Sequence, residues 1–252
     1  MSRTLLDTLR NGKTLIFRHR GASADAPMNT LAAFNLAVDQ GADGIELDVH
    51  RSKDGHAVIV HDFDVDATTD GEGRVVDMTL AELKGLDAGS WFGESFVGAQ
   101  IPTLDEVFTA VGDKLFINVE IKSNSPDTDG VEQLVANKIA AFNMANRVLV
   151  SSFNPLALKR FRDVMPDVPI GFLYSAGFAE DIWQVMDDVS HEARHPHHVM
   201  IDSDYMVWAG ENNFFVNTWT VNDVQRAIAL RDLGVNVVMT DTPGVMRAAF
   251  TR

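Results

Sequence analysis

The sequence contains no cysteine among its 252 residues, which excludes disulfide bonds and metal sites built on thiolates. It also has no run approaching the roughly 20 apolar residues of a membrane-spanning helix. Residues 1–13 lack the apolar core of a secretory signal peptide. These absences predict a cytoplasmic protein that does not cross a membrane, and a chain without thiols is compatible with a reducing compartment.

Positive charge is scarce. The chain has 21 Lys and Arg residues against 36 Asp and Glu residues, which gives a formal net charge of −15. Such a surface repels polyanions, so neither nucleic acid nor a stable association with anionic membranes is expected. A small anionic substrate is compatible with this charge if the site supplies its own cations. For most of the acids, solubility is the simpler explanation.

The chain also lacks low-complexity tracts, long linkers and obvious internal repeats, so a single domain over residues 1–252 is predicted. Short apolar runs that are typical of strands alternate with helix-length segments. The predicted strands cover residues 14–17, 44–49, 114–121, 147–151, 170–174, 198–202, 214–218 and 236–240. The predicted helices cover residues 29–40, 104–111, 131–141, 155–164 and 222–233.

This alternation indicates a parallel sheet, and the chain length suits closure into a (β/α)8 TIM barrel of the α/β class. Helix-start residues at Thr30 or Asn29, at Asn154 and at Asn222, and helix-stop glycines at Gly41 and Gly234, agree with the predicted helices. A doubly wound open sheet is the alternative. It usually carries a glycine-rich phosphate loop after its first strand, and the sequence has none.

Two features depart from a plain barrel. Asp54 and Gly55 form a tight-turn pair, and a chain that folds back about them would place Asp48 opposite His61. Residues 63–100 are too many for a simple loop and carry scattered glycines and aromatic residues. We therefore expect a small insertion on the rim of the barrel, after the hairpin that follows the second strand.

Charged and imidazole side chains gather at the predicted carboxyl ends of strands, where TIM barrels place their catalytic groups. Because side chains alternate along a strand, two acids of one strand share a face, and so do an acid and a lysine of another. The candidate residues are His19, Arg20, Glu46, Asp48, His61, Glu120 and Lys122.

The negative charge of three acids in one barrel mouth needs to be compensated. Two carboxylates about 4 Å apart repel by roughly 4 kcal/mol at an effective dielectric near 20, so Glu46, Asp48 and Glu120 would either take up protons or hold a cation. An all-oxygen cluster suits Mg²⁺ or Ca²⁺ better than zinc, and the ligands do not choose between those two ions. The two histidines can act as general acid and base, and Arg20 and Lys122 can donate to an anion.

Each candidate also has a purely structural explanation. A single histidine is more often a surface or core residue, and acids at a barrel rim can be salt-bridge partners. The acid and the lysine of the third predicted strand can simply bind each other. A second histidine cluster spans residues 191–198, but Pro196 would break a helix that brought His191 and His195 together. No metal site is therefore predicted there.

Several motifs, in order along almost the whole chain, resemble those of the glycerophosphodiester phosphodiesterases. The first group comprises residues 19–30, 41–49, 54–55 and 61–62. The second group comprises residues 101–107, 118–122, 151–155, 219–222 and 240–243. Each piece is short, but the ordered set is highly specific.

The resemblance implies a TIM barrel with a small insertion, one divalent cation, and hydrolysis of a glycerophosphodiester to glycerol 3-phosphate and an alcohol. It also implies that the substrate's own glycerol 2-hydroxyl attacks first, which suits a chain without a cysteine or a GxSxG nucleophile motif. The implied roles are metal ligation by Glu46, Asp48 and Glu120, acid–base catalysis by His19 and His61, and phosphate binding by Arg20 and Lys122.

Two positions depart from the family pattern. Met28 stands where the family usually has a glutamate, and Ala67 stands where it usually has an arginine. Both changes bear on substrate pose, head-group preference and rate. Head-group preference is also expected to depend on loop shape, with Trp219, Trp91 and Phe92 as candidate pocket residues that can equally be ordinary packing.

Two other functions are compatible with the sequence. One is a phospholipase-D-like or phosphoinositide-lyase-like enzyme of the same barrel superfamily, for which the net charge of −15 is unfavourable on anionic bilayers. The other is a catalytically weak protein that binds a glycerophosphodiester, which the change at Met28 suggests. The sequence does not indicate the oligomeric state.

Overall fold

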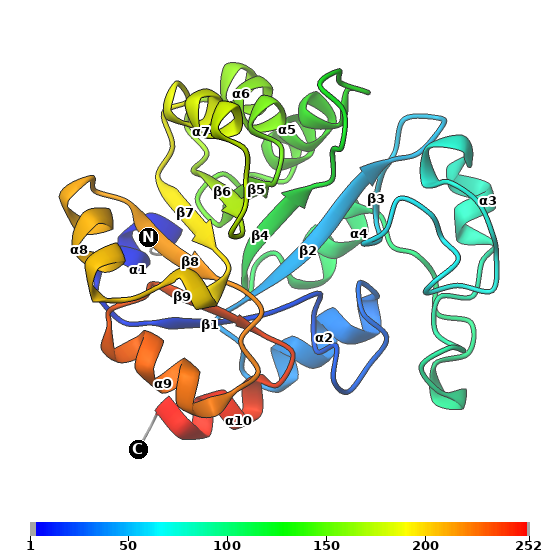
Figure 1. Cartoon of the computed structure of the whole chain (residues 1–252). Helices are drawn as coiled ribbons and strands as arrows, with labels where there is room; N and C mark the ends of the chain where they lie inside the picture. The colour runs from blue at the N-terminus through cyan, green and yellow to red at the C-terminus, as the bar shows by residue number, and fades with distance from the viewer. Residues whose placement is uncertain (1–3, 251–252) are drawn as a thin grey trace.

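The sheet closes because its first strand pairs with its last. β1 (Leu15–Arg18) runs parallel to β9 (Val237–Thr240) on one side and to β2 (Gly44–Arg51) on the other. The other barrel strands are β4 (Phe116–Ile121), β5 (Val148–Ser152), β6 (Ile170–Tyr174), β7 (Ala193–Pro196) and β8 (Phe215–Thr218), all paired in parallel. This computed structural model, which describes residues 4–250, confirms the predicted TIM barrel (Figure 1).

Helices surround the barrel and follow its strands along the chain (Figure 1). They are α2 (Leu31–Asp39), α4 (Leu104–Val111), α5 (Val131–Ala141), α6 (Pro155–Val164), α7 (Glu180–Asp187), α8 (Ser203–Glu211), α9 (Val224–Asp232) and α10 (Pro243–Phe250). The predicted helices are confirmed, with Thr30 and Asn154 as N-caps. The predicted start at Asn222 is wrong, because the N-cap of α9 is Asp223.

The end of the barrel away from the strand carboxyl ends is apolar and plugged. Helix α1 (Leu5–Arg10), which the sequence analysis did not predict, buries Leu5 and Leu9 against inward-facing residues such as Leu15 and Val237. The Leu5 amide donates to the carbonyl of Asn146 at 2.8 Å, which anchors the helix. Because this end is closed, polar side chains inside the barrel face the opposite mouth.

One predicted strand is in the wrong place. Residues 198–202 were expected to form a strand, but His198–Met200 is a short 3-10 helix, and the sixth barrel strand is β7, a few residues earlier. The sequence Ala-Arg-His-Pro of β7 looks polar, yet all four residues are buried. Residues distant in sequence cover its polar side chains, so the burial of this strand cannot be predicted from its own sequence.

Arg194 and His195 of β7 lie on opposite faces of the sheet. The Arg194 guanidinium lies outside the barrel, 4.7 Å from the ring centroid of Phe214. His195 lies inside, fully buried, with Nε2 at 2.9 Å from the side-chain nitrogen of Asn217. Burial lowers the pKa of His195 to about 3, so the ring is neutral at physiological pH. His195 is therefore a core residue.

The hairpin after β2 is shifted by one residue from the predicted register. The Ser52 amide donates to the His56 carbonyl at 2.9 Å, so the loop contains three residues, not the expected two. Val49 consequently pairs with Ile59 of β3 (Ala57–Ile59), and the Asp48 carbonyl accepts from the amide of Val60. Asp48 therefore does not lie opposite His61, and the prediction that it does is wrong.

Residues 63–100 form the predicted insertion beside the barrel (Figure 1). They contain η1 (Val75–Asp77), α3 (Leu80–Lys84) and η2 (Glu94–Phe96). A separate small core holds the insertion to the hairpin; its buried members are Val58, Val60, Val65, Val75, Leu83, Ala88 and Ile101. Within residues 4–250, the structure contains no helix with the length and apolar character needed to span a bilayer.

Replacement of Gly171 in β6 tests how tightly the barrel interior is packed. An added Cβ would lie 2.3 Å from Nε2 of the buried His195. We expect Gly171→Ala to lower the free energy of unfolding by about 1–3 kcal/mol, as other overpacked cores do. Urea denaturation measures the change.

Gly210→Ala is the matched control, because Gly210 lies within α8 and its Cβ would meet no heavy atom within 4 Å. This variant should gain up to about 1 kcal/mol from the higher helix propensity of alanine. Equal effects of the two substitutions would contradict the packing described for His195.

Candidate active site

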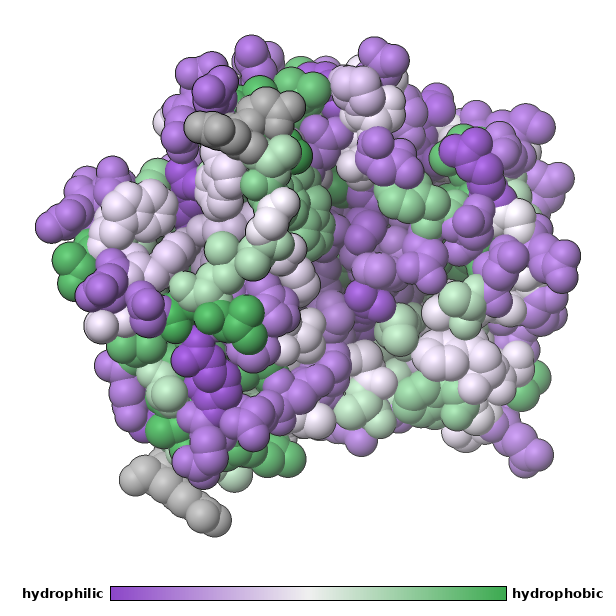
Figure 2. All heavy atoms as spheres, in the orientation of Figure 1, coloured by the Kyte–Doolittle hydropathy of each residue, from purple (hydrophilic) through white to green (hydrophobic). Residues whose placement is uncertain are grey.

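A pocket of about 170 Å³ opens at the carboxyl ends of the barrel strands. Near the middle of the face in Figure 2 the surface is hollowed and largely hydrophilic. The residues that line the pocket are His19, Arg20, Glu46, Asn118, His61, Glu120, Phe153, Leu173, Trp219, Thr220 and Met239. Of the predicted site residues, Asp48 and Lys122 do not line it but contact residues that do.

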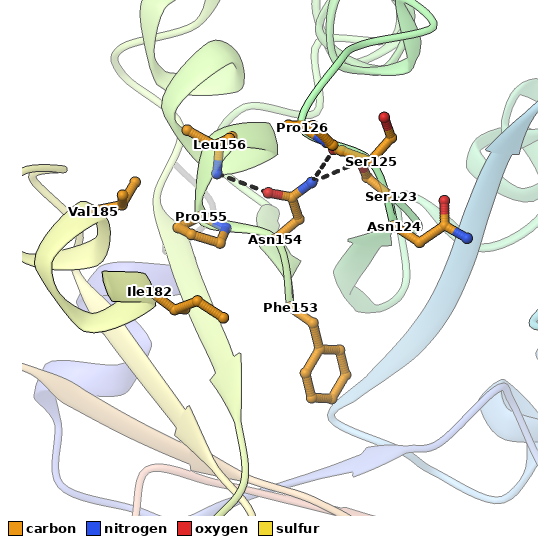
Figure 3. Close-up of a pocket in the computed structure, with 10 residues that line it drawn as sticks. All are labelled: Ser123, Asn124, Ser125, Pro126, Phe153, Asn154, Pro155, Leu156, Ile182 and Val185. Atoms are coloured by element: carbon orange, nitrogen blue, oxygen red, sulfur yellow. Dashed lines mark hydrogen bonds between the residues drawn. The ribbon is translucent and has the colours of Figure 1, made fainter. Parts of the chain in front are cut away.

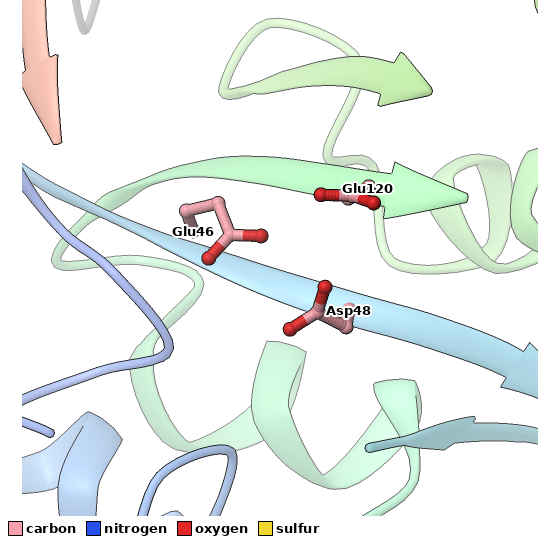
Figure 4. A group of neighbouring side chains, drawn as sticks. All are labelled: Glu46, Asp48 and Glu120. Atoms are coloured by element: carbon pink, nitrogen blue, oxygen red, sulfur yellow. The ribbon is translucent and has the colours of Figure 1, made fainter. Parts of the chain in front are cut away.

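Three carboxylates form the floor of this site. Glu46 and Asp48 extend from β2 and Glu120 from the adjacent β4, and Figure 4 shows their carboxylates turned toward one another. One oxygen from each lies within 4.8 Å of the others, and all three residues are buried. Asp48 and Glu120 are register partners in the sheet, which places the two strands' acids side by side. A hard cation with several oxygen ligands fits this donor set.

Two cations partly compensate the acids. The Lys122 ammonium lies 2.8 Å from Oε1 of Glu120 and 3.4 Å from Oδ1 of Asp48. The Arg20 Nε lies 3.5 Å from Oδ2 of Asp48. Three carboxylates against two cations leave one negative charge in excess. The site therefore remains suited to a further positive charge, although the lysine and its neighbouring acid do bind each other.

The pKa values reflect this imbalance. Burial opposes ionisation of Asp48, but attraction to Lys122 and Arg20 outweighs it and lowers the pKa of Asp48. Burial, reinforced by repulsion from Asp48 and Glu120, raises the pKa of Glu46 well above its usual range. Burial, together with Asp48, raises the pKa of Glu120 to about 7 despite the nearby ammonium. The electrostatic cost of the excess negative charge thus falls on the two glutamates, whose ionisation is disfavoured.

The loop after β1 is shaped around the acids. Arg20 and Asn29 both adopt left-handed backbone conformations, with φ values of 58° and 57°. In this conformation the Arg20 amide donates to Oε2 of Glu46 at 3.1 Å. The Asn29 side chain donates to Oδ2 of Asp48 at 2.8 Å. Asn29 was predicted only as a possible helix start, so its contact with the acids was missed.

The two histidines each have a carboxylate at Nδ1. His19 Nδ1 lies 2.8 Å from Oδ1 of Asp241, and His61 Nδ1 lies 2.6 Å from Oδ1 of Asp62. The Asn222 side chain donates to the other oxygen of Asp241 at 2.7 Å. A carboxylate accepts the Nδ1 proton, which leaves Nε2 of each ring as the nitrogen that can exchange a proton.

Neither Asp241 nor Asn222 was predicted from the sequence to take part in the site. Asp241 directly follows β9. It therefore occupies the same kind of strand-end position that identified the other candidates. Asn222 lies in the loop after β8, where its side chain was taken for a helix start. Their relation to His19 depends on pairing between the first and last strands, which sequence spacing does not reveal.

Aromatic residues form one wall of the pocket. Trp219 lines it, with its indole N–H donating to the His195 carbonyl at 2.9 Å and its ring in edge contact with Phe153. Its donor is therefore used by the protein, and its ring also contacts that of His197. Trp91 and Phe92 pack against each other in the insertion and do not line this pocket.

The two departures from the family pattern lie in different places. The Met28 sulfur lies 3.3 Å from Nη1 of Arg20, so a weak acceptor contacts the guanidinium there. Ala67 is exposed in the insertion and does not line the pocket. Only the change at Met28 therefore directly alters the surroundings of a predicted site residue.

Known proteins resemble this chain over almost its whole length. The family model described as "Glycerophosphoryl diester phosphodiesterase family" matches residues 19–245. A glycerophosphodiester phosphodiesterase of Caldanaerobacter subterraneus is 43% identical over 92% of this chain and 95% of its own. A putative glycerophosphodiester phosphodiesterase of Bacillus subtilis is 37% identical over 90% of this chain and 94% of its own.

Solved structures show the same architecture. A phosphodiesterase of Oleispira antarctica, solved with the product sn-glycerol-3-phosphate, superposes with a TM-score of 0.85 at 30% identity, covering 97% of this chain and 99% of that one. A glycerophosphodiester phosphodiesterase of Agrobacterium tumefaciens superposes with a TM-score of 0.79 at 27% identity, covering 93% and 99%.

Glu46→Gln tests the charge imbalance. Because Glu46 has a raised pKa when folded, its ionisation destabilises the protein as pH rises, and Glu120 adds to this loss between its unfolded value of 4.5 and about 7. In EDTA at pH 8 we expect the free energy of unfolding of the variant to be at least about 1 kcal/mol higher than that of the wild type. Thermal denaturation at several pH values measures the difference.

Added Mg²⁺ or Ca²⁺ should stabilise the wild type by binding linkage and the variant much less. Glu72→Gln, which alters an exposed acid of the insertion, should behave as the wild type in both conditions. A wild type more stable than Glu46→Gln in EDTA would contradict the charge excess.

Proposed function

The chain belongs to the glycerophosphoryl diester phosphodiesterase family, and from this premise we propose that it hydrolyses glycerophosphodiesters such as glycerophosphocholine or glycerophosphoethanolamine to glycerol 3-phosphate and an alcohol. The observation that carries the proposal is one pocket lined by two imidazoles above a cluster of three carboxylates. The product in the Oleispira structure supports glycerol 3-phosphate as the product here. The net charge of −15 favours a small molecule over an anionic bilayer as substrate.

We infer that Glu46, Asp48 and Glu120 would hold one divalent cation, Mg²⁺ or Ca²⁺. Their oxygens lie within 4.8 Å of one another, and Oδ1 of Asp48 accepts no hydrogen bond from the described part of the chain. When bound, such a cation supplies positive charge that polarises the phosphoryl oxygens of the substrate. The raised pKa values of the two glutamates support this assignment, because a cation would favour their ionised forms.

Arg20 and Lys122 are proposed to bind the phosphate. Both are within 3.5 Å of Asp48, so they can exchange part of that interaction for the substrate's anionic oxygens. Attraction to Glu120 and Asp48 outweighs burial and raises the pKa of Lys122, which keeps its ammonium charged. The neutral Met28 sulfur, unlike a carboxylate, does not compete strongly with phosphate for the Arg20 guanidinium.

His19 and His61 are proposed to move the protons. One imidazole takes the proton of the glycerol 2-hydroxyl as its oxygen attacks phosphorus, and the other gives a proton to the alcohol oxygen as the P–O bond breaks. Water then opens the cyclic phosphate with the two roles reversed. Burial lowers the pKa of His61, which favours its neutral form as the first proton acceptor.

Removal of either imidazole tests this mechanism. His19→Ala and His61→Ala should each lower kcat for glycerophosphocholine by about 10²–10⁴-fold, because each removes a group that transfers a proton. Release of glycerol 3-phosphate in the presence of Mg²⁺ or Ca²⁺ is the measurement, and EDTA should abolish it. His56→Ala, at the exposed hairpin turn, is the control and should retain activity.

Full turnover in EDTA would exclude a required cation, and full turnover in either histidine variant would exclude that residue's role. Binding of glycerophosphocholine without turnover would identify the chain as a binding protein.

Asp241→Asn tests whether the carboxylate positions His19. The amide cannot accept a proton from Nδ1 as strongly, so kcat should fall about 10–100-fold with little change in KM. Asp62→Asn should have a smaller effect, because its side chain is 49% exposed against 32% for Asp241 and its charge is better screened. Steady-state kinetics with unchanged thermal stability would support positioning; a larger loss in Asp62→Asn would contradict it.

A further inference from the structure

A second and larger pocket, of about 370 Å³, adjoins the candidate active site (Figure 3). Its walls come from the loops after β4 and β5, from the start of α6 and from α7, all on the same side of the barrel as the acids. Phe153 lines both pockets, so its side chain lies between them. A substrate held in the smaller pocket can therefore extend past this ring into the larger one.

The second pocket presents a mainly apolar surface. Its lining includes Pro126, Leu156, Ile182 and Val185 in addition to Phe153. Four polar residues, Ser123, Asn124, Ser125 and Asn154, share the lining. The Asn154 amide is already used by the protein: it donates to the Ser125 carbonyl at 2.7 Å and to the Ser123 hydroxyl at 2.9 Å (Figure 3). None of the ten described residues around the pocket carries a charge.

The sizes of the two pockets suggest how a substrate divides between them. Pockets that enclose drug-sized ligands have volumes of about 300–1,000 Å³, so the 170 Å³ active-site pocket can enclose only a small group such as glycerol phosphate. The alcohol on the other side of the phosphate must then lie outside it. The neighbouring pocket of about 370 Å³ is large enough to receive that alcohol.

We propose that the second pocket binds the leaving alcohol of the diester and selects an uncharged, apolar alcohol. This inference rests on the proposed function and narrows its substrate class. A cationic head group would be recognised by carboxylates or by several aromatic faces, whereas this pocket offers no carboxylate among its described residues and only Phe153 as an aromatic ring. Alkyl esters of glycerol 3-phosphate fit the lining better than choline or ethanolamine esters.

A homologous series of diesters tests the proposal. Glycerol 3-phosphate esters of methanol, butanol and hexanol are compared with glycerophosphocholine by kcat/KM in the presence of Mg²⁺ or Ca²⁺. Each methylene that enters the pocket should raise kcat/KM by about two- to fourfold through burial of apolar surface. The butyl and hexyl esters should therefore exceed both the methyl ester and glycerophosphocholine.

Two substitutions localise the effect. Val185→Asn places an amide in the pocket and should flatten the dependence on chain length, and Leu156→Trp should fill the pocket and reverse the preference for hexyl over methyl. Val207→Asn is the matched control, because it makes the same change at an exposed position of α8. It should retain the wild-type dependence on chain length.

The outcomes separate this inference from the proposed function. If glycerophosphocholine is hydrolysed but kcat/KM is constant or falls with chain length, the pocket assignment is wrong and the activity stands. If an alkyl chain on the glycerol, and not on the leaving alcohol, produces the increase, the assigned occupant is wrong. If no diester in the series is hydrolysed, the proposed function itself fails.

Discussion

The electrostatic balance around Asp48 is the interaction on which the rest of the site depends. This buried carboxylate lies between Lys122, Arg20 and the Asn29 amide, and these contacts keep its pKa low despite burial. The cost of the remaining negative charge then falls on the two glutamates beside it, whose pKa values are raised. The left-handed backbone of Arg20 has a clear reason in this context, because it turns the amide toward Glu46 while the guanidinium approaches Asp48. Local backbone strain is thus used to compensate charge.

The apolar residues that stabilise the barrel lie at one end, and the buried acids, which destabilise it by their mutual repulsion, lie at the other. At the plugged end, α1 and the inward-facing residues form an apolar core, and His195 is accommodated as a neutral ring beside Gly171. At the open end, the acids lie on two adjacent strands, β2 and β4, which pair in parallel from Gly44 and Phe116 to Val49 and Ile121. This pairing holds the backbones of the acids side by side, which maintains a site suited to a cation.

The two imidazoles are held by partners of different origin. His61 is bound by its sequence neighbour Asp62, so that contact is local. His19 is bound by Asp241, which is 222 residues away and reaches it because β9 pairs with β1. The pair of imidazoles that the proposed mechanism needs is therefore assembled only when the barrel closes. The structural match to the Oleispira phosphodiesterase over 97% of this chain indicates that this closure belongs to the fold and not to one local motif.

The sequence by itself determined the class of fold and the identity of the acids. Alternation of apolar runs with helical segments predicted the barrel, and strand parity placed Glu46 and Asp48 on one face, because both follow from local geometry. Tertiary structure decided the rest: a three-residue turn shifted the hairpin by one position, and buried surroundings made a strand of the polar residues of β7. The contact between His19 and Asp241 and the apolar pocket beside Phe153 likewise arise from segments distant in sequence. Local patterns carry no information on such contacts, since the free energy that stabilises them exists only after the chain has closed on itself.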